Sequence, residues 1–270
     1  MQEIDLVLSG SGIRFYAFWG AYQELRKHFK IKRIAGTSGG SIVGGLISLV
    51  NNELLTYEEA EKILMQQQPK KYIDPNFFFW NGWCIYKGKK FLKILHDVFK
   101  DHKFSDLKDL YVVVTDLSNR KPVVLSAYTT PNEKVYKWIY ASSAVPFVFR
   151  PLKVDNRMFV DGLVTINFAI DLFEDNKRPT IGLRVTSSQD KEANLKSLVG
   201  RTIAVVETFR QAAEREHVED AYWARVIRID TGSISSLDFF DADTFKPNLI
   251  ERGRQTTCEW IQRNKEDLLE

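Results

Sequence analysis

The first fifty residues repeat one pattern twice: a short apolar run, a turn rich in glycine and serine, and a segment with helical periodicity. The run IDLVL (4–8) leads into the turn SGSG (9–12) and then into FYAFWGAYQELRKHF, whose apolar residues recur at helical spacing. The run IKRIAG enters a second such turn, and SIVGGLISLV continues as an apolar helix. Short buried strands that alternate with helices are typical of parallel sheets. The pattern therefore predicts an α/β fold.

The rest of the chain continues this alternation, without a repeat or a low-complexity stretch. A chain of 270 residues can bury one large core or two small ones, and we interpret residues 1–270 as a single domain. We expect further strands at 111–117, 122–127, 158–162, 180–185 and 225–230. We expect further helices at 57–67, 89–100, 133–143, 195–217 and 242–264.

The composition restricts the kinds of partner and compartment. A formal net charge of +3 is too small to indicate a nucleic-acid partner. The N-terminus MQEIDLVLSG has acidic residues where a signal peptide needs basic ones, and no apolar run approaches the length of a membrane-spanning helix. Cys84 and Cys258 lie far apart in the sequence, which favours a reducing compartment over a disulfide framework. We expect a cytoplasmic protein that meets a membrane, if at all, peripherally from the aqueous side.

One irregular segment could provide that membrane contact. Residues 68–88 separate two expected helices and contain the aromatic cluster FFFWNGW. Phe and Trp usually pack inside a protein, so the cluster is interpreted first as core and second as a patch that enters a lipid interface. The second interpretation is favoured by flanking cations, which attract anionic lipid surfaces. The residues concerned are Phe77, Phe78, Phe79, Trp80 and Trp83, with Lys70, Lys71, Lys87, Lys89 and Lys90 beside them.

The second turn contains a candidate nucleophile. Gly36-Thr37-Ser38-Gly39-Gly40 fits G-x-S-x-G, which places a serine on a sharp strand-to-helix turn and exposes its hydroxyl above the helix N-terminus. A tight turn whose serine only caps the following helix fits the same letters. The surrounding residues have to distinguish the two interpretations.

The first turn could stabilise the negative charge that develops during acyl transfer. Gly10, Ser11 and Gly12 follow the first strand and precede a helix, where free backbone N–H groups and the helix dipole favour an oxyanion. A dinucleotide-binding G-x-G-x-x-G motif is the rival interpretation. It fails because Phe15 stands where the third glycine belongs, and because the second strand ends without an acidic residue that could bind a ribose.

A serine nucleophile also needs a base. An α/β-hydrolase has the order Ser, acid, His, and of the four histidines only His217 comes late enough. His217 lies in EREHVED, which is typical of a solvated helix surface. Asp161 in FVDGLVTIN follows an apolar strand, and a partly desolvated carboxylate has a raised pKa and is a better base towards a hydroxyl. A D-G pair is also an ordinary turn signal.

GTSGG, LSGSGIRF and FVDG together resemble the patatin-like phospholipase family, whose members use a Ser–Asp dyad without histidine. YASSAVPFVFRPL (140–152) and the C-terminal segment from SLDFFDADTF onward are similar to further blocks of that family, in the same order. The resemblance implies a three-layer α/β/α sandwich with a mainly parallel central sheet. It also implies that Ser38 is the nucleophile, Asp161 its base and residues 10–12 the oxyanion loop. Arg14 would take the family's basic position, assigned here to substrate binding.

The chain also departs from the family pattern. The family usually has three glycines at 10–12, a glycine at Phe15, Gly or Ala at Leu163, and N-x-P where this chain has Asn167-Phe168-Ala169. These differences affect the expected substrate preference and leave the dyad intact.

From the resemblance we expect an enzyme that hydrolyses acyl esters of phospholipids or other lipids, without metal or cofactor. A Ser-His-Asp esterase that uses His217 and a catalytically silent protein that binds lipid or protein are the alternatives. Head-group preference and any activating partner or oligomer stay open.

Overall fold

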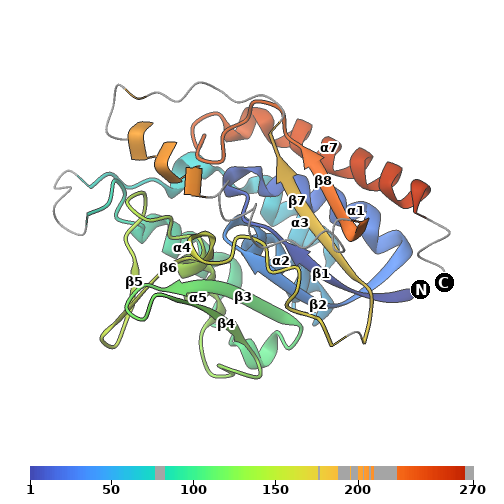
Figure 1. Cartoon of the computed structure of the whole chain (residues 1–270), viewed down its shortest axis with the longest axis horizontal. Helices are drawn as coiled ribbons and strands as arrows, with labels where there is room; N and C mark the ends of the chain where they lie inside the picture. Colours follow the sequence, from blue (N-terminus) through green and yellow to red (C-terminus); the bar gives the residue numbers. More distant parts are fainter. Residues whose placement is uncertain are drawn as a thin grey trace.

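The computed structural model describes residues 1–76, 83–175, 177–187, 195, 200–202, 204–206, 208–209 and 224–264. These residues form a mixed eight-stranded sheet flanked by helices (Figure 1). The strand order is β5-β6-β3-β2-β1-β7-β8, and β4 pairs with β3 outside this path. Strands β1, β2, β3, β7 and β8 are parallel, which confirms the expected α/β class with a mainly parallel sheet. The strands are β1 (Gln2–Leu8), β2 (Phe29–Thr37), β3 (Leu110–Asp116), β4 (Lys121–Ser126), β5 (Leu152–Val154), β6 (Arg157–Asp161), β7 (Thr180–Thr186) and β8 (Val226–Asp230).

The helices begin and end close to the expected positions. They are α1 (Tyr16–His28), α2 (Gly39–Asn51), α3 (Tyr57–Gln66), α4 (Lys89–Phe99), α5 (Val135–Ser142) and α7 (Ala242–Arg263), with short 3-10 turns η1 (Gly12–Phe15), η2 (Pro69–Tyr72), η3 (Phe104–Asp106) and η4 (Gly162–Val164). Of the helix expected over 195–217, the described residues between 200 and 209 are helical. Residue 195 lies in a turn, and the rest of that segment, including His217, lies outside the described residues, as do Phe77, Phe78, Phe79 and Trp80 of the aromatic cluster.

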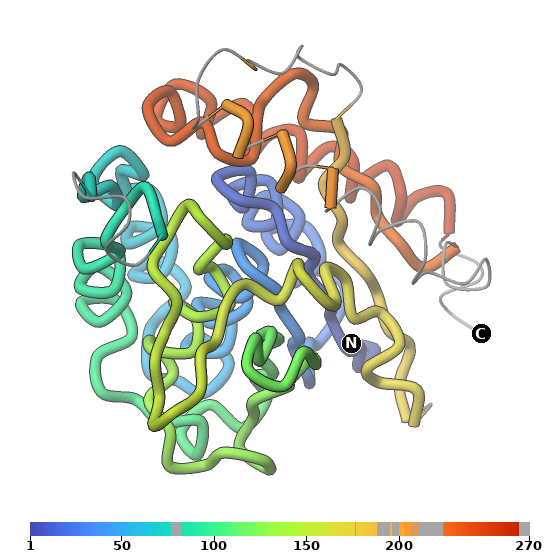
Figure 2. The backbone as a smooth tube through the Cα atoms, turned by 60° about the vertical axis from the view of Figure 1, so that its left-hand side comes forward, coloured from blue at the N-terminus to red at the C-terminus, as the bar shows by residue number. Residues whose placement is uncertain are grey.

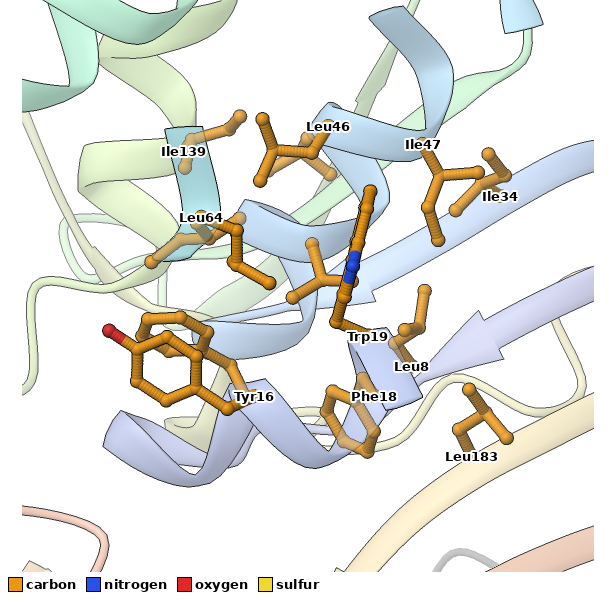
Figure 3. Close-up of a cluster of buried hydrophobic side chains, with 14 of the residues drawn as sticks. Leu8, Tyr16, Phe18, Trp19, Ile34, Leu46, Ile47, Leu64, Ile139 and Leu183 are labelled. Atoms are coloured by element: carbon orange, nitrogen blue, oxygen red, sulfur yellow. The ribbon is translucent and has the colours of Figure 1, made fainter. Parts of the chain in front are cut away.

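The side chains of β1 alternate between two differently covered faces of the sheet. Leu8 is fully buried on the face that carries the helices, where it belongs to the same apolar cluster as Trp19 of α1 (Figure 3). Val7 points to the opposite face and packs with Phe168 and Phe173 from the segment between β6 and β7. Burial on both faces explains why the last three residues of the first strand, 6–8, are all apolar, as is typical of a parallel strand.

The N-terminal and C-terminal helices pack together at a very short separation. A Cβ atom at Gly20 of α1 would lie 1.9 Å from the carbonyl oxygen of Ile250, and one at Gly253 of α7 would lie 1.9 Å from that of Ala17. The two glycines therefore let the helix backbones touch. Figure 2 shows the result, with the red C-terminal helix lying along the blue N-terminal one.

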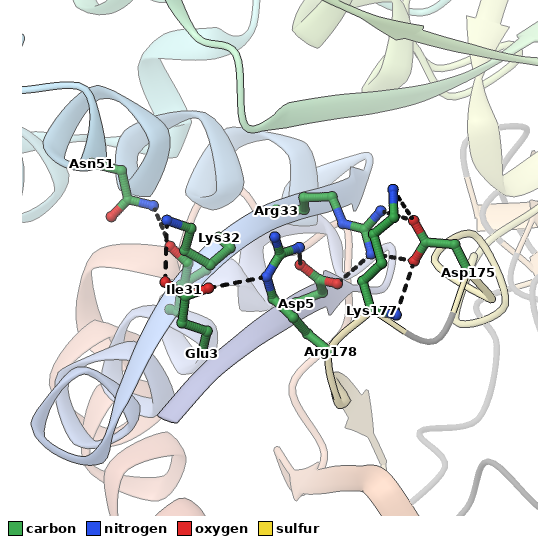
Figure 4. Close-up of polar contacts among 9 residues, drawn as sticks. All are labelled: Glu3, Asp5, Ile31, Lys32, Arg33, Asn51, Asp175, Lys177 and Arg178. Carbon is green, nitrogen blue, oxygen red and sulfur yellow. Dashed lines mark hydrogen bonds and ion pairs between the residues drawn. The ribbon is translucent and has the colours of Figure 1, made fainter. Parts of the chain in front are cut away.

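A network of charges around the buried Asp5 connects the chain before β7 to the sheet (Figure 4). Asp5 of β1 is fully buried, and Arg33 of β2 donates to its Oδ2 at 2.5 Å. Arg33 also binds both carboxylate oxygens of Asp175, each at 2.7 Å, while Arg178 lies 3.6 Å from Asp5. Hydrogen bonds from Arg33 keep the pKa of Asp175 well below its usual range. The network thus links β1 and β2 to the segment that follows Asp161 along the chain.

Two strands end head to head beside β3, and this arrangement creates the site. On one edge of β3, Val113 pairs with Thr37, the last residue of the parallel strand β2. The next residue, Val114, pairs with Asp161, the last residue of the antiparallel strand β6. Strand β4 pairs with β3 along its length, so β2 and β6 share the other edge and run towards each other. The residue after Thr37 therefore faces Asp161.

Candidate active site

The site is centred on a direct hydrogen bond between the two residues at these strand ends. The Oγ of Ser38 donates to the Oδ2 of Asp161 at 2.6 Å, across 123 positions of sequence. Ser38 is 4% exposed and Asp161 is 0% exposed. A short bond from a hydroxyl to a buried carboxylate is the geometry in which a carboxylate can accept the proton of a serine nucleophile.

The backbone of Ser38 is strained. Its φ is 53° and its ψ is −126°, a conformation that residues with a side chain rarely adopt. Three hydrogen bonds hold it: the N–H donates to the Oγ of Ser142 at 2.8 Å, and the carbonyl accepts from the N–H and Oγ of Ser41 at 2.9 and 2.7 Å. Ser142 in turn donates to the carbonyl of Val113. The turn is therefore clamped between α5 and β3, as a sharp strand-to-helix turn that projects a side chain requires.

The glycines of the second turn provide room for the first turn. A Cβ atom at Gly40 would lie 2.5 Å from the carbonyl oxygen of Ser9, and one at Gly39 would lie 2.5 Å from that of Gly12. The loop 10–12 thus packs against the residue that follows Ser38. In many acyl hydrolases the N–H after the nucleophile and a second loop form the oxyanion hole, and this chain brings two such segments together.

The loop itself is held by neighbours far away in the sequence. The N–H of Gly10 donates to the carbonyl of Asn167 at 2.9 Å, and that of Ile13 donates to the carbonyl of Ser236 at 2.8 Å. Gly12 has a φ of 56°, and a Cβ there would lie 2.0 Å from the same Ser236 oxygen. Ser11 and Gly12 precede and begin η1, where N–H groups of a first turn have no intrahelical acceptor.

Arg14 lies beside this loop but does not line the cavity in front of Ser38. Its side chain is 2% exposed, and its Nε donates to the carbonyl of Ser11 at 3.2 Å. The structure thus places Arg14 where it can fix the orientation of the Ser11 peptide. The substrate contact expected for Arg14 stays a prediction.

Burial changes the acidity of Asp161. Because the carboxyl is enclosed in the protein, its pKa rises from 3.8 to about 7, even though hydrogen bonds from Leu163 and Ser38 act in the opposite direction. The N–H of Leu163 donates to Oδ1 at 2.9 Å and leaves Oδ2 for Ser38. A carboxylate with a pKa near 7 is a far stronger base than an exposed aspartate and is still partly ionised at neutral pH.

A small apolar cavity of about 30 Å³ opens in front of Ser38. It is large enough for one or two water-sized groups and too small for a long acyl chain without movement of its walls. Ser143, 6% exposed, lines it, and its Oγ has no hydrogen-bond partner among the described residues. Apolar side chains make up most of the remaining wall, among them Ile42, Tyr72, Phe91, Val145, Phe149 and Phe239.

Several of these contributors could not be found from sequence patterns. Ser142 and Ser143 lie in the run YASSAVPF, whose small residues signal close packing but not which hydroxyl meets the nucleophile. Ser236 and Phe239 come from the loop between β8 and α7, where the family-like segment SLDFFDADTF begins, but that resemblance does not indicate which of its residues meet the site. In the described part of the chain, no group of three or more His, Cys, Asp or Glu residues is placed to hold a metal ion. None of the described helices is long and apolar enough to cross a membrane.

Comparison with known proteins gives a consistent family assignment. Residues 6–174 match the model of the patatin-like phospholipase family, which is more than half of the chain. The uncharacterized protein YqhO of Bacillus subtilis is 29% identical over 94% of this chain and 96% of its own length. A protein of invertebrate iridescent virus 6, named probable lipid hydrolase 463L, is 27% identical over 62% of each chain. The crystal structure of VipD from Legionella pneumophila shares the fold, with a TM-score of 0.58 at 12% identity over 97% of this chain and 67% of VipD. The chain belongs to the patatin-like phospholipase family.

Proposed function

We propose that this family member is a serine acyl hydrolase that cleaves fatty-acyl esters of lipids, with Ser38 as nucleophile and Asp161 as general base. The observation that carries the proposal is the 2.6 Å bond from the Ser38 hydroxyl to a carboxylate with 0% exposure. No imidazole lies between the two groups, so the proton has a direct path from oxygen to oxygen.

The geometry supports the following sequence of steps. The Ser38 Oγ attacks the carbonyl carbon of the ester while its proton moves to Oδ2 of Asp161. The carbonyl oxygen becomes an oxyanion, for which Gly39 and the loop residues Ser11 and Gly12 supply backbone N–H groups; that of Gly10 already donates to Asn167. The intermediate then collapses, the bond to the leaving alcohol breaks, and the alkoxide takes the proton from Asp161. Water repeats the sequence on the acyl-enzyme, with Asp161 again as base.

In this assignment Arg14 is a positioning residue. Its Nε holds the Ser11 carbonyl, which orients the following peptide and with it the N–H of Gly12. The apolar wall around the small cavity suits the first carbons of an acyl chain, since it offers hydrocarbon few polar neighbours.

The test is covalent labelling followed by mapping. A fluorophosphonate probe reacts with an activated serine and should modify Ser38 in the wild-type protein. Ser38→Ala should abolish labelling and ester hydrolysis, and Asp161→Asn should reduce both by at least about a thousandfold while the protein stays folded. Modification of a different serine, or turnover by folded Ser38→Ala, would overturn the assignment.

A further inference from the structure

A second, larger depression lies next to the dyad and is not used by the proposed chemistry. It has a volume of about 680 Å³ and is lined mainly by apolar side chains. Leu163 forms part of its wall, while the N–H of the same residue donates to the Asp161 carboxylate. We call this depression the apolar groove.

The apolar groove collects large apolar side chains that are exposed to solvent. Trp83 is 65% exposed, Phe209 63% and Phe147 52%, and Leu117, Met158 and Val164 are each at least 40% exposed. Single exposed apolar residues are common on proteins, but a contiguous group of this kind marks a surface that meets another apolar phase.

Two of the aromatic residues are held outward at a conformational cost. Trp83 and Phe147 have φ values of 49° and 64°, in the left-handed region that bulky side chains avoid. Among the described residues, the others with a side chain in this region, apart from Ser38, are polar and lie at helix ends or in hairpin turns: Glu53, Lys100, Arg120 and Asp155. Backbone bonds fix the two aromatic segments side by side, because the N–H of Ile85 donates to the carbonyl of Phe147 at 2.8 Å. The fold therefore keeps both rings on the surface.

The positive charge at the apolar groove indicates which kind of partner fits it. Arg150 and Lys153 line it, and none of the described lining residues carries a carboxylate. Aromatic side chains and cations together favour the boundary of an anionic lipid bilayer, where rings enter the interface and cations meet head groups. A peptide would bring N–H and C=O groups that need partners, and this lining offers few polar atoms to satisfy them.

We propose that the apolar groove is the surface by which the protein rests on anionic membranes, with Trp83 and Phe147 inserted at the lipid boundary. Leu163 lines the apolar groove and its N–H donates to the Asp161 carboxylate, so docking at this surface places the bilayer near the proposed dyad. This inference rests on the proposed lipid hydrolysis for the reason why the protein would dock, but binding of the protein to vesicles can be measured without ester turnover. The Ser38→Ala variant separates the two, since failure of catalysis leaves its vesicle binding unaffected.

The experiment measures binding of Ser38→Ala protein to vesicles of phosphatidylcholine with and without phosphatidylglycerol. Trp83→Gly with Phe147→Gly should lower the partition coefficient on anionic vesicles at least about tenfold. Glycine adopts positive φ freely, so this pair removes the rings and the backbone strain together, and the melting temperature should not fall sharply. In the background with Ser38 intact, vesicle hydrolysis should fall with binding while turnover of a short soluble ester stays unchanged.

Matched variants complete the test. Tyr128, 78% exposed and outside the apolar groove, provides the control: Tyr128→Ser should leave vesicle binding unchanged. Lys153→Glu keeps the aromatic residues and should weaken binding to anionic vesicles only, which gives a second readout if the glycine pair does not fold. Undiminished binding by the glycine pair and by Lys153→Glu, or no binding by the parent protein, would overturn the proposal. So would a concentration-dependent dimer that the glycine pair abolishes, because the surface would then join two copies of the chain.

Discussion

Asp161→Asn should make the protein more stable at neutral and alkaline pH while it removes the proposed base. The carboxyl has a pKa of about 7 in the folded protein, against an ordinary value of 3.8, because it is buried. A raised pKa means that the folded state holds the proton more tightly than the unfolded chain does. The contribution of Asp161 to the free energy of unfolding is therefore highest below about pH 4, decreases between about pH 4 and pH 7, and stays low above that.

The size of the effect follows from the two pKa values. Their separation corresponds to about 4 kcal/mol of destabilisation at high pH, of which about 2.5 kcal/mol develops between pH 5 and pH 8. Asparagine has nearly the same shape and does not titrate. Its oxygen can accept from the N–H of Leu163 and its amide can donate to the Ser38 hydroxyl, so both hydrogen bonds of the site have a replacement.

Urea unfolding of both proteins at pH 5 and pH 8 measures this difference. The gain in stability of Asp161→Asn over the wild type should be about 2.5 kcal/mol larger at pH 8 than at pH 5. Subtraction cancels the other titrating groups. Ser38→Ala is the control, because it loses the nucleophile but keeps the carboxylate. The Ser38 hydrogen bond lowers the pKa of Asp161, so without it the free energy of unfolding should depend on pH at least as steeply as in the wild type. A gain that is the same at both pH values would show that the Asp161 carboxyl is not perturbed.

Three further variants test other parts of the structure. His217→Ala should retain most ester hydrolysis if the Ser–Asp pair is sufficient, and a loss as complete as that of Ser38→Ala would favour a triad. Arg33→Ala should cost about 3–5 kcal/mol of stability in urea unfolding, because it leaves the buried carboxylate of Asp5 without its nearest cation. An unchanged unfolding midpoint would contradict that account. Ser143→Ala should raise the free energy of unfolding by about 1 kcal/mol, since the hydroxyl lacks a partner among the described residues; a decrease would show that the hydroxyl is bonded in solution.

Local patterns predicted most of the strands and helices. Parallel strands that are buried on both faces appear as short apolar runs, and helices appear as apolar residues at helical spacing. Strand β5 (Leu152–Val154) was missed, since three residues are too short for a periodicity to appear. The distance from Ser38 to Asp161 could not be derived from spacing. It depends on β2 and β6 sharing an edge of β3, a register that only the whole sheet defines. The family resemblance, which draws on other sequences, paired these two residues.

The same reasoning explains why the supporting contacts escaped prediction. Ser142 meets Ser38 across 104 positions, and the Ser236 carbonyl meets Ile13 from the far end of the chain. Both serines lie in segments that resemble family blocks, but serine is a common residue and the resemblance does not say which atom each one contacts. The role of Arg14 came from the family resemblance alone. The fold adds what the sequence could not, that its buried side chain donates to the Ser11 carbonyl.

Several departures from local rules fall on the two surfaces to which we assign function. Around the dyad, a serine occupies a strained conformation, a carboxylate is buried without a cation in its described hydrogen bonds, and the Ser143 hydroxyl lacks a described partner. At the apolar groove, two strained aromatic residues face solvent. Each feature costs stability, and packing elsewhere must offset it. These destabilising features have independent origins, namely burial of a charge, backbone strain and a missing hydrogen bond. They nevertheless fall on two adjoining sites that Leu163 connects, which favours catalysis and lipid contact as parts of one function.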